Sequence, residues 1–231
     1  MATTGGQTTD LRVRNLLLMA LTVSSGAVDA ISFLGLGKVF TAFMTGNFVF
    51  LGLVTAGAGG PSVVSVTVSL AFFAAGVFLA TRIVKPSKDT GVWPRRATIA
   101  LGVAGVAQAS FLAVWVAAGG LPASGVANVL IGLSALAMGM QTATVYSLGL
   151  RGVFTTAATA TLTVLMSALA TFSRSAETER RLLAGVLVSL FVGATVGGLL
   201  LVYARAYAPV LPLAITILVV TTAAIALWGR H

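Results

Sequence analysis

The sequence predicts an all-α membrane protein with six transmembrane helices in two inverted three-helix repeats. Hydrophobic residues make up 58% of the 231 residues and charged residues only 8%, with a mean hydropathy of +1.04. A soluble domain carries about 25% charged residues. Six apolar segments are long enough to cross a bilayer, and a motif of the first half recurs in the second. Each repeat also contains a short non-crossing segment, predicted as a strand leading into a half-helix.

Charge and residue usage exclude several functions. The 14 basic and 5 acidic residues give a net charge of +9, but the basic residues lie between apolar runs, which indicates topology signals rather than nucleic-acid binding. There is no cysteine, and the single histidine is His231. No phosphate loop or nucleophile–base constellation is present, so we expect no enzyme activity, no metal and no cofactor.

The six predicted spans lie near residues 15–36, 62–84, 97–119, 124–147, 182–204 and 208–228. Each covers about 30 Å of hydrocarbon at a rise of about 1.5 Å per residue. Two further apolar segments, 40–57 and 154–171, are shorter and dense in Thr, Gly and Asn. Hydropathy alone does not decide whether these two segments cross.

The positive-inside rule favours six crossings over eight. With eight, the basic residues divide 6 inside against 8 outside, which is no bias. With six, only Lys38 and Arg205 lie outside, and 12 lie inside. This arrangement places both termini in the cytoplasm. The residues that change sides between the two arrangements are Arg82, Lys85, Lys88, Arg95, Arg96 and Arg151, while Arg12, Arg14, Arg174, Arg180, Arg181 and Arg230 stay inside.

An internal repeat divides the chain near its middle. Residues 35–41 (GLGKVFT) align with residues 149–155 (GLRGVFT) at an offset of 114, and Thr45 then aligns with Thr159. The repeats are residues 1–119 and 120–231 of one integral-membrane domain. Because each half has three crossings, the second copy is inverted relative to the first.

Inverted repeats with discontinuous helices are typical of secondary transporters. Residues 40–43 favour an extended backbone, and Thr45, Gly46 and Asn47 can begin a half-helix whose amides point toward the protein centre. Irregular backbone at membrane depth must be buried in protein or line a cavity, because hydrocarbon offers no hydrogen bonds. Both short segments are therefore expected to face inward.

Asp29 is the only acidic residue within a predicted span. Inserting an ionised Asp near the centre of a membrane helix costs roughly 2.5–3.5 kcal/mol on insertion scales, so such a residue usually has a specific role. Two roles remain open for Asp29: a proton or cation coupling site, and a structural carboxylate that is hydrogen-bonded to the half-helix. Gln141 lies at roughly the corresponding place in the second half, and Thr159 completes the candidate site. Other neutral polar groups are expected to join helices: Gln108, Asn128, Thr155 and Thr161.

Small residues spaced four apart predict close helix packing. They are Gly193 with Gly197, Gly105 with Ala109, and Ala135 with Gly139.

The run of residues 26–34 (GAVDAISFL), continuing through residues 44–47 (MTGN), resembles the YoaK family of bacterial multi-pass membrane proteins. That family is described as a domain of unknown function. The resemblance implies six membrane helices in a bacterial inner membrane. In the second half, Thr142 stands where the family has Asn, and Ala160 replaces the Gly of a Thr-Gly-Thr pattern.

The predicted function is a small secondary transporter of unknown substrate, with a central polar site formed by Asp29, Thr45, Gly46, Asn47, Gln141 and Thr159. The alternative is a non-transporting membrane assembly or regulatory protein. A third class, an ion channel, predicts a continuous polar path. The expected partners are the lipid bilayer, a small molecule or ion, and a second copy of the chain in a homodimer.

Overall fold

The computed structural model describes residues 3–85, 91–150, 152–170 and 177–227, and in these ranges it contains helices and no β-strand. Four basic residues of the topology argument, Lys88, Arg151, Arg174 and Arg230, lie outside the described residues. In chain order the helices are α1 (Thr3–Gly35), α2 (Met44–Thr55), α3 (Val63–Val84), α4 (Arg95–Ala117), α5 (Ser124–Ser147), α6 (Ala158–Ala170), α7 (Glu177–Tyr203), the 3-10 helix η1 (Arg205–Tyr207) and α8 (Val210–Ala226).

Within the part of the chain that the structure describes, six stretches are long and apolar enough to cross a membrane, which confirms the predicted number of spans. They comprise α1, α3, α4, α5, α7 and the stretch Arg205–Ala226, which contains η1 and α8. Many large apolar side chains on these helices are exposed, as expected where lipid rather than protein covers a helix.

The two short segments form α2 and α6, of 12 and 13 residues. At about 1.5 Å per residue, both are well below the roughly 30 Å of a bilayer core. The predicted strand in residues 40–43 is wrong. These residues are irregular, because their amides bond to side chains of α1 and α2 rather than to a neighbouring strand.

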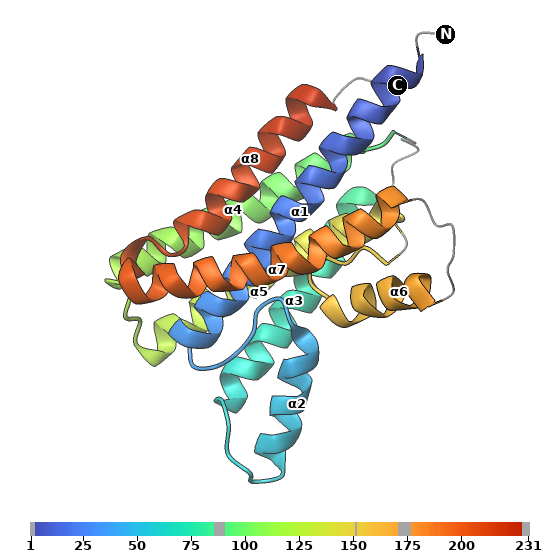
Figure 1. The fold of residues 1–231 in the computed structure, drawn as a ribbon. Helices are drawn as coiled ribbons and strands as arrows, with labels where there is room; N and C mark the ends of the chain where they lie inside the picture. The colour runs from blue at the N-terminus through green and yellow to red at the C-terminus, as the bar shows by residue number, and fades with distance from the viewer. Residues whose placement is uncertain (1–2, 86–90, 151, 171–176, 228–231) are drawn as a thin grey trace.

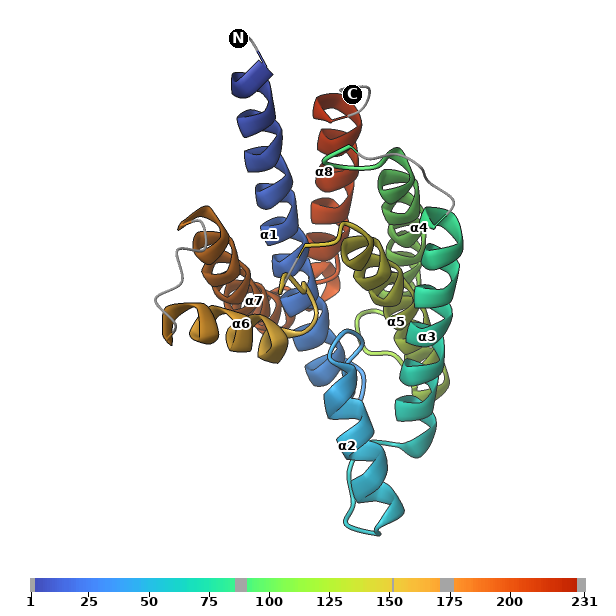
Figure 2. The same ribbon diagram turned by 90° about the vertical axis from the view of Figure 1, so that its right-hand side faces the viewer.

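Helices α1 and α5 form the centre of the bundle (Figure 1). Helix α1 packs against α7 and α8, and α5 packs in the same way against α3 and α4, while α4 contacts α8. The half-helix α2 lies against α3, and α6 lies against α7. Figure 2 shows that α1 and α5 run in opposite directions, with the free faces of α2 and α6 at the margin of the molecule.

Glycines allow the two tightest helix pairs, α1–α7 and α3–α5. A Cβ atom added to Gly193 would overlap the carbonyl group of Val23, and one added to Gly139 would overlap that of Phe73. Such close backbone approach is the usual role of small residues in membrane helices, and it confirms the packing predicted at Gly193, Gly197 and Gly139. The other glycines that meet a facing backbone in this way are Gly26 and Gly76. At Gly105 the prediction is not confirmed, because a Cβ atom there would make only an ordinary contact with Thr216.

Candidate functional site

Asp29 holds the turn between α1 and α2. Its Oδ1 atom accepts hydrogen bonds from the amides of Thr41 at 3.0 Å, Ala42 at 2.8 Å and Phe43 at 3.4 Å. Phe43 is the residue before α2 and cannot cap the helix with its own side chain. The carboxylate therefore satisfies three consecutive backbone donors of the turn, which have no helical partner before α2 begins.

Asn47 fixes the same turn from the other side. Its Oδ1 accepts the amide of Phe40 at 3.0 Å, and its Nδ2 donates to the Phe40 carbonyl at 2.7 Å and to Ser69 of α3 at 3.1 Å. In the second half, Thr161 Oγ1 accepts the amide of Phe154 at 3.4 Å. Since 161 and 154 stand 114 positions after 47 and 40, the two turns use the same side-chain-to-backbone bond.

A third set of hydrogen bonds connects the halves through α5. Thr41 and Ser134 share a hydrogen bond of 2.8 Å between their hydroxyl groups. Gln141 donates to the Leu21 carbonyl of α1 at 3.1 Å and to Thr155 at 3.4 Å. Both irregular turns are thus attached to the central helix pair by buried polar groups.

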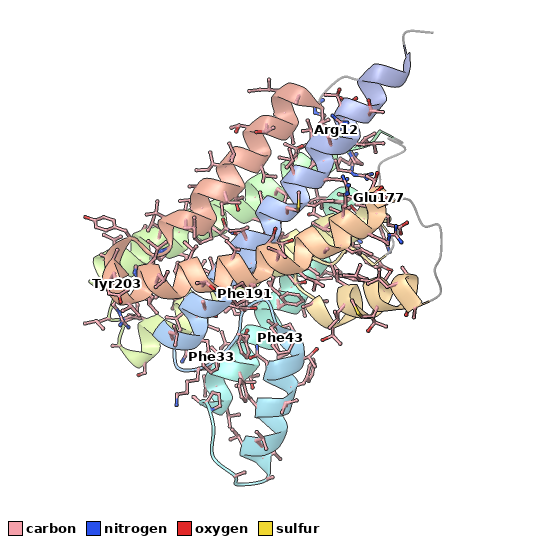
Figure 3. The ribbon with its side chains drawn as sticks, in the orientation of Figure 1. Arg12, Phe33, Phe43, Glu177, Phe191 and Tyr203 are labelled. Atoms are coloured by element: carbon pink, nitrogen blue, oxygen red, sulfur yellow. The ribbon has the colours of Figure 1, made fainter. Side chains whose placement is uncertain are left out.

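One cavity, the Asp29 cavity, lies between α1, α7 and the two turns, with a volume of about 520 Å³. Figure 3 labels Phe33 and Phe43, which line it where α1 and α2 meet. Thr156 and Thr159, at the start of α6, line it from the second half. Its remaining lining residues are Gly26, Asp29, Ala30, Leu34, Phe40, Ala158, Leu190 and Ala194.

A second cavity, the Thr142 cavity, has a volume of about 660 Å³ and lies between α3, α5 and the turn before α6. Its lining residues include Thr142, Tyr146 and Phe154, which stand 113, 113 and 114 positions after three lining residues of the Asp29 cavity, namely Asp29, Phe33 and Phe40. Both cavities adjoin the turn before α6: Thr156, which lines the Asp29 cavity, shares a hydrogen bond of 3.1 Å with Thr142, which lines the Thr142 cavity.

The structure distributes the predicted site residues over different roles. Asp29 and Thr159 line the same cavity. Asn47 and Gln141 are almost fully buried in the hydrogen bonds that hold the turns. Gly46 lies beneath the rings of Phe40 and Phe43, where a Cβ atom would collide with them. Thr45 is exposed and lines neither the Asp29 cavity nor the Thr142 cavity.

Sequence reasoning missed the aromatic lining of the Asp29 cavity and the position of Thr142. It placed Gln141 opposite Asp29, whereas Thr142 lines the corresponding cavity. Thr142 bonds its own turn through a 3.1 Å contact between its hydroxyl and that of Thr156. The offset of 114 would have paired Asp29 with Ala143, and a shift of one residue, to an offset of 113, pairs Asp29 with Thr142 and Phe33 with Tyr146.

Comparison with known proteins assigns the family. The family model described as "Protein of unknown function (DUF1275)" matches residues 17–223. The chain belongs to the DUF1275 family. It is similar to the UPF0700 transmembrane protein YoaK of Bacillus subtilis (strain 168), with 37% identity over 153 residues that cover 66% of each chain, just under two thirds of that relative. No solved structure matches.

These findings confirm the resemblance noted in the first-half motif. The six apolar helices and the transmembrane relative together identify this DUF1275 chain as a multi-pass membrane protein.

Proposed function

We propose that this protein is a small secondary transporter that binds its solute in the Asp29 cavity. The observation that carries the proposal is the pair of cavities: three lining residues of the Thr142 cavity stand 113 or 114 positions after three lining residues of the Asp29 cavity. Carriers built from inverted repeats form their solute site between equivalent elements of the two halves, so cavities with matching lining residues are expected in such a carrier. A volume of about 520 Å³ is within the usual range of small-molecule sites.

The transporter proposal includes the inverted repeat, with halves 1–119 and 120–231. The helix contacts support this repeat, in which α1 to α4 correspond to α5 to α8. The contact of α1 with α7 corresponds to that of α5 with α3, the contact of α1 with α8 to that of α5 with α4, and the contact of α6 with α7 to that of α2 with α3. Glycines allow the closest approach in both pairs, Gly26 and Gly193 between α1 and α7, and Gly76 and Gly139 between α3 and α5. Because the positive-inside rule puts most basic residues on the cytoplasmic side, the proposal places both termini in the cytoplasm and the helices in the bacterial cytoplasmic membrane.

Asp29 is the proposed coupling residue. Its Oδ1 is engaged by three amides, and no hydrogen bond to Oδ2 is found among the described residues. Oδ2 can therefore take a proton or a cation while the turn stays in place. Thr142, at the equivalent position, carries no charge, so coupling is assigned to the first half alone.

The test is flux into proteoliposomes that contain the purified full chain. A pH or sodium gradient should drive uptake of at least one solute from a chemically broad panel. The Asp29→Asn variant should lose gradient-driven uptake and remain folded, since an amide oxygen accepts the same three amides. Thr142→Val serves as the matched variant of the other half and should retain coupling. Absence of flux for every solute, with folded protein in the vesicles, would contradict the proposal.

The second candidate is a membrane assembly or regulatory protein without transport. The three amide bonds to Asp29 and the buried bonds of Asn47 favour it, because both residues stabilise the turn whether or not a solute binds. It predicts that Asp29 variants alter stability and partner binding, with no flux at any gradient. The homodimer predicted from the sequence is compatible with either candidate function. The mass of the purified protein in detergent tests it.

A further inference from the structure

The Asp29 cavity carries one negative charge and no positive one among its lining residues. Asp29 is the single ionisable side chain of this lining, and the lysines and arginines of the described residues lie elsewhere. Its partly buried carboxylate already accepts three amides through Oδ1, which leaves Oδ2 as the polar atom that can meet a ligand. A cation is the ligand that such a site favours, because an anion would be repelled by the carboxylate.

Three phenylalanine rings stand beside this carboxylate. Phe33 and Phe40 are stacked with ring centroids 5.0 Å apart, and Phe43 meets Phe40 edge-on at 5.2 Å. All three line the cavity together with Asp29. Aromatic rings attract cations through their negative faces, and they bury apolar groups at the same time. Because Phe40 is stacked on Phe50 as well as on Phe33, Phe33 and Phe43 are the rings that can meet a cation, and Phe40 adds apolar surface.

The remaining walls argue against a bare metal ion. Alkali and alkaline-earth cations require several oxygen ligands at once. Here the wall is mostly apolar, since Ala30, Leu34, Leu190 and Ala194 line it together with the rings. The hydroxyls of Thr156 and Thr159 come from another segment. The cavity of about 520 Å³ also far exceeds the size of a single ion. An organic ion fills this space better.

We propose that the Asp29 cavity binds a monovalent organic cation, an ammonium group carried on a small apolar body. The ammonium group lies at Asp29 Oδ2, and the body lies against Phe33, Phe40 and Phe43. This inference rests on the proposed transport function, for which it names the solute class.

The Thr142 cavity has the complementary character. It keeps two aromatic residues, Tyr146 and Phe154, but Thr142 replaces the carboxylate and Lys85 adds a positive charge to the lining. An organic cation is held less tightly there, since the attractive charge is absent and a like charge is near. The difference between the two cavities thus gives a high-affinity and a low-affinity site for the same ligand.

The experiment measures equilibrium binding of trimethyl(2-phenylethyl)ammonium to the purified full chain in detergent. We expect saturable binding, and at least tenfold weaker binding by the Asp29→Asn variant. Phe33→Leu should weaken binding several-fold, while Phe48→Leu, the same change at an exposed position of α2 that lines neither cavity, should leave it unchanged. 3-Phenylpropionate and 3-phenylpropan-1-ol, which keep the apolar body with a negative or no charge, should bind at least tenfold more weakly.

Equal binding of the three probes, unchanged binding by the folded Asp29→Asn variant, or no binding by the folded wild-type chain would overturn the organic-cation site. Uptake of the same probe into proteoliposomes separates this inference from the proposed function. Binding without uptake supports the site and contradicts transport. Uptake of neutral or anionic solutes by a chain that does not bind the cation supports transport and overturns the organic-cation site.

Discussion

The carboxylate of Asp29 in α1 accepts the backbone amide of Ala42 at 2.8 Å, which attaches the turn before α2 to the wall of the cavity that Asp29 lines. One side chain thereby has both a structural and a ligand-facing atom. The amides of Thr41 and Phe43 bind the same oxygen. Changes at Asp29 must therefore be chosen so that the two roles are separated.

Asp29→Ala and Asp29→Asn are expected to differ in stability. Alanine leaves three amides without an acceptor, and each unsatisfied buried donor costs about 1–3 kcal/mol, so the variant should lose several kcal/mol in total. Asparagine keeps an acceptor oxygen and should lose less. The midpoint of thermal unfolding in detergent measures both. Equal midpoints for Asp29→Ala and the wild type would show that the amides find other acceptors.

Asn47→Ala is expected to destabilise the turn between α1 and α2. It removes the bonds to Phe40 and to Ser69, at a cost of about 1–3 kcal/mol. Thr45→Ala, at an exposed position on the same helix, is the matched control and should change stability by about 0.5 kcal/mol or less. Thermal unfolding of the two variants side by side measures the difference. A larger effect at Thr45 than at Asn47 would contradict the described turn.

Gly193→Val and Gly139→Val are expected to separate the two tightest helix pairs. Each added side chain would overlap a facing carbonyl group, and overpacking of this kind costs about 1–3 kcal/mol or more. Gly102→Val is the control, because no atom lies within 4 Å of a Cβ built there. The yield of folded monodisperse protein after detergent extraction measures the effect. Wild-type yields for all three variants would mean that these helices are farther apart than described.

Single cysteines are expected to map the six crossings, since the natural chain has none. In intact cells, cysteines at Lys38, Ala58 and Ser124 should react with a membrane-impermeant reagent from outside. Cysteines at Lys85 and Thr178 should react only after the cells are permeabilised. Labelling of Lys38 and Ala58 from opposite sides would show that α2 crosses the membrane, and the inverted repeat would then fail.

The separation of spanning from short helices was predictable from the sequence. Hydropathy and segment length identify the long helices, because each must satisfy its own backbone across about 30 Å of hydrocarbon. The 12-residue α2 and 13-residue α6 were likewise anticipated by their length and polarity. The predicted strand failed because strand propensity presumes a partner strand, whereas residues 40–43 bond to Asp29 and Asn47.

The sequence alone determined the membrane class, the number of spans, and that Asp29 is the only acidic residue within a predicted span. These follow from composition, segment length and the cost of a charge in lipid. Only the tertiary structure decided that Asp29 lines one cavity together with three phenylalanines and Thr159, while Asn47 and Gln141 form the hydrogen bonds that hold the turns. The reason is physical. Which polar atoms remain available to a ligand depends on the hydrogen bonds made between segments far apart in the chain, and no local pattern records those bonds.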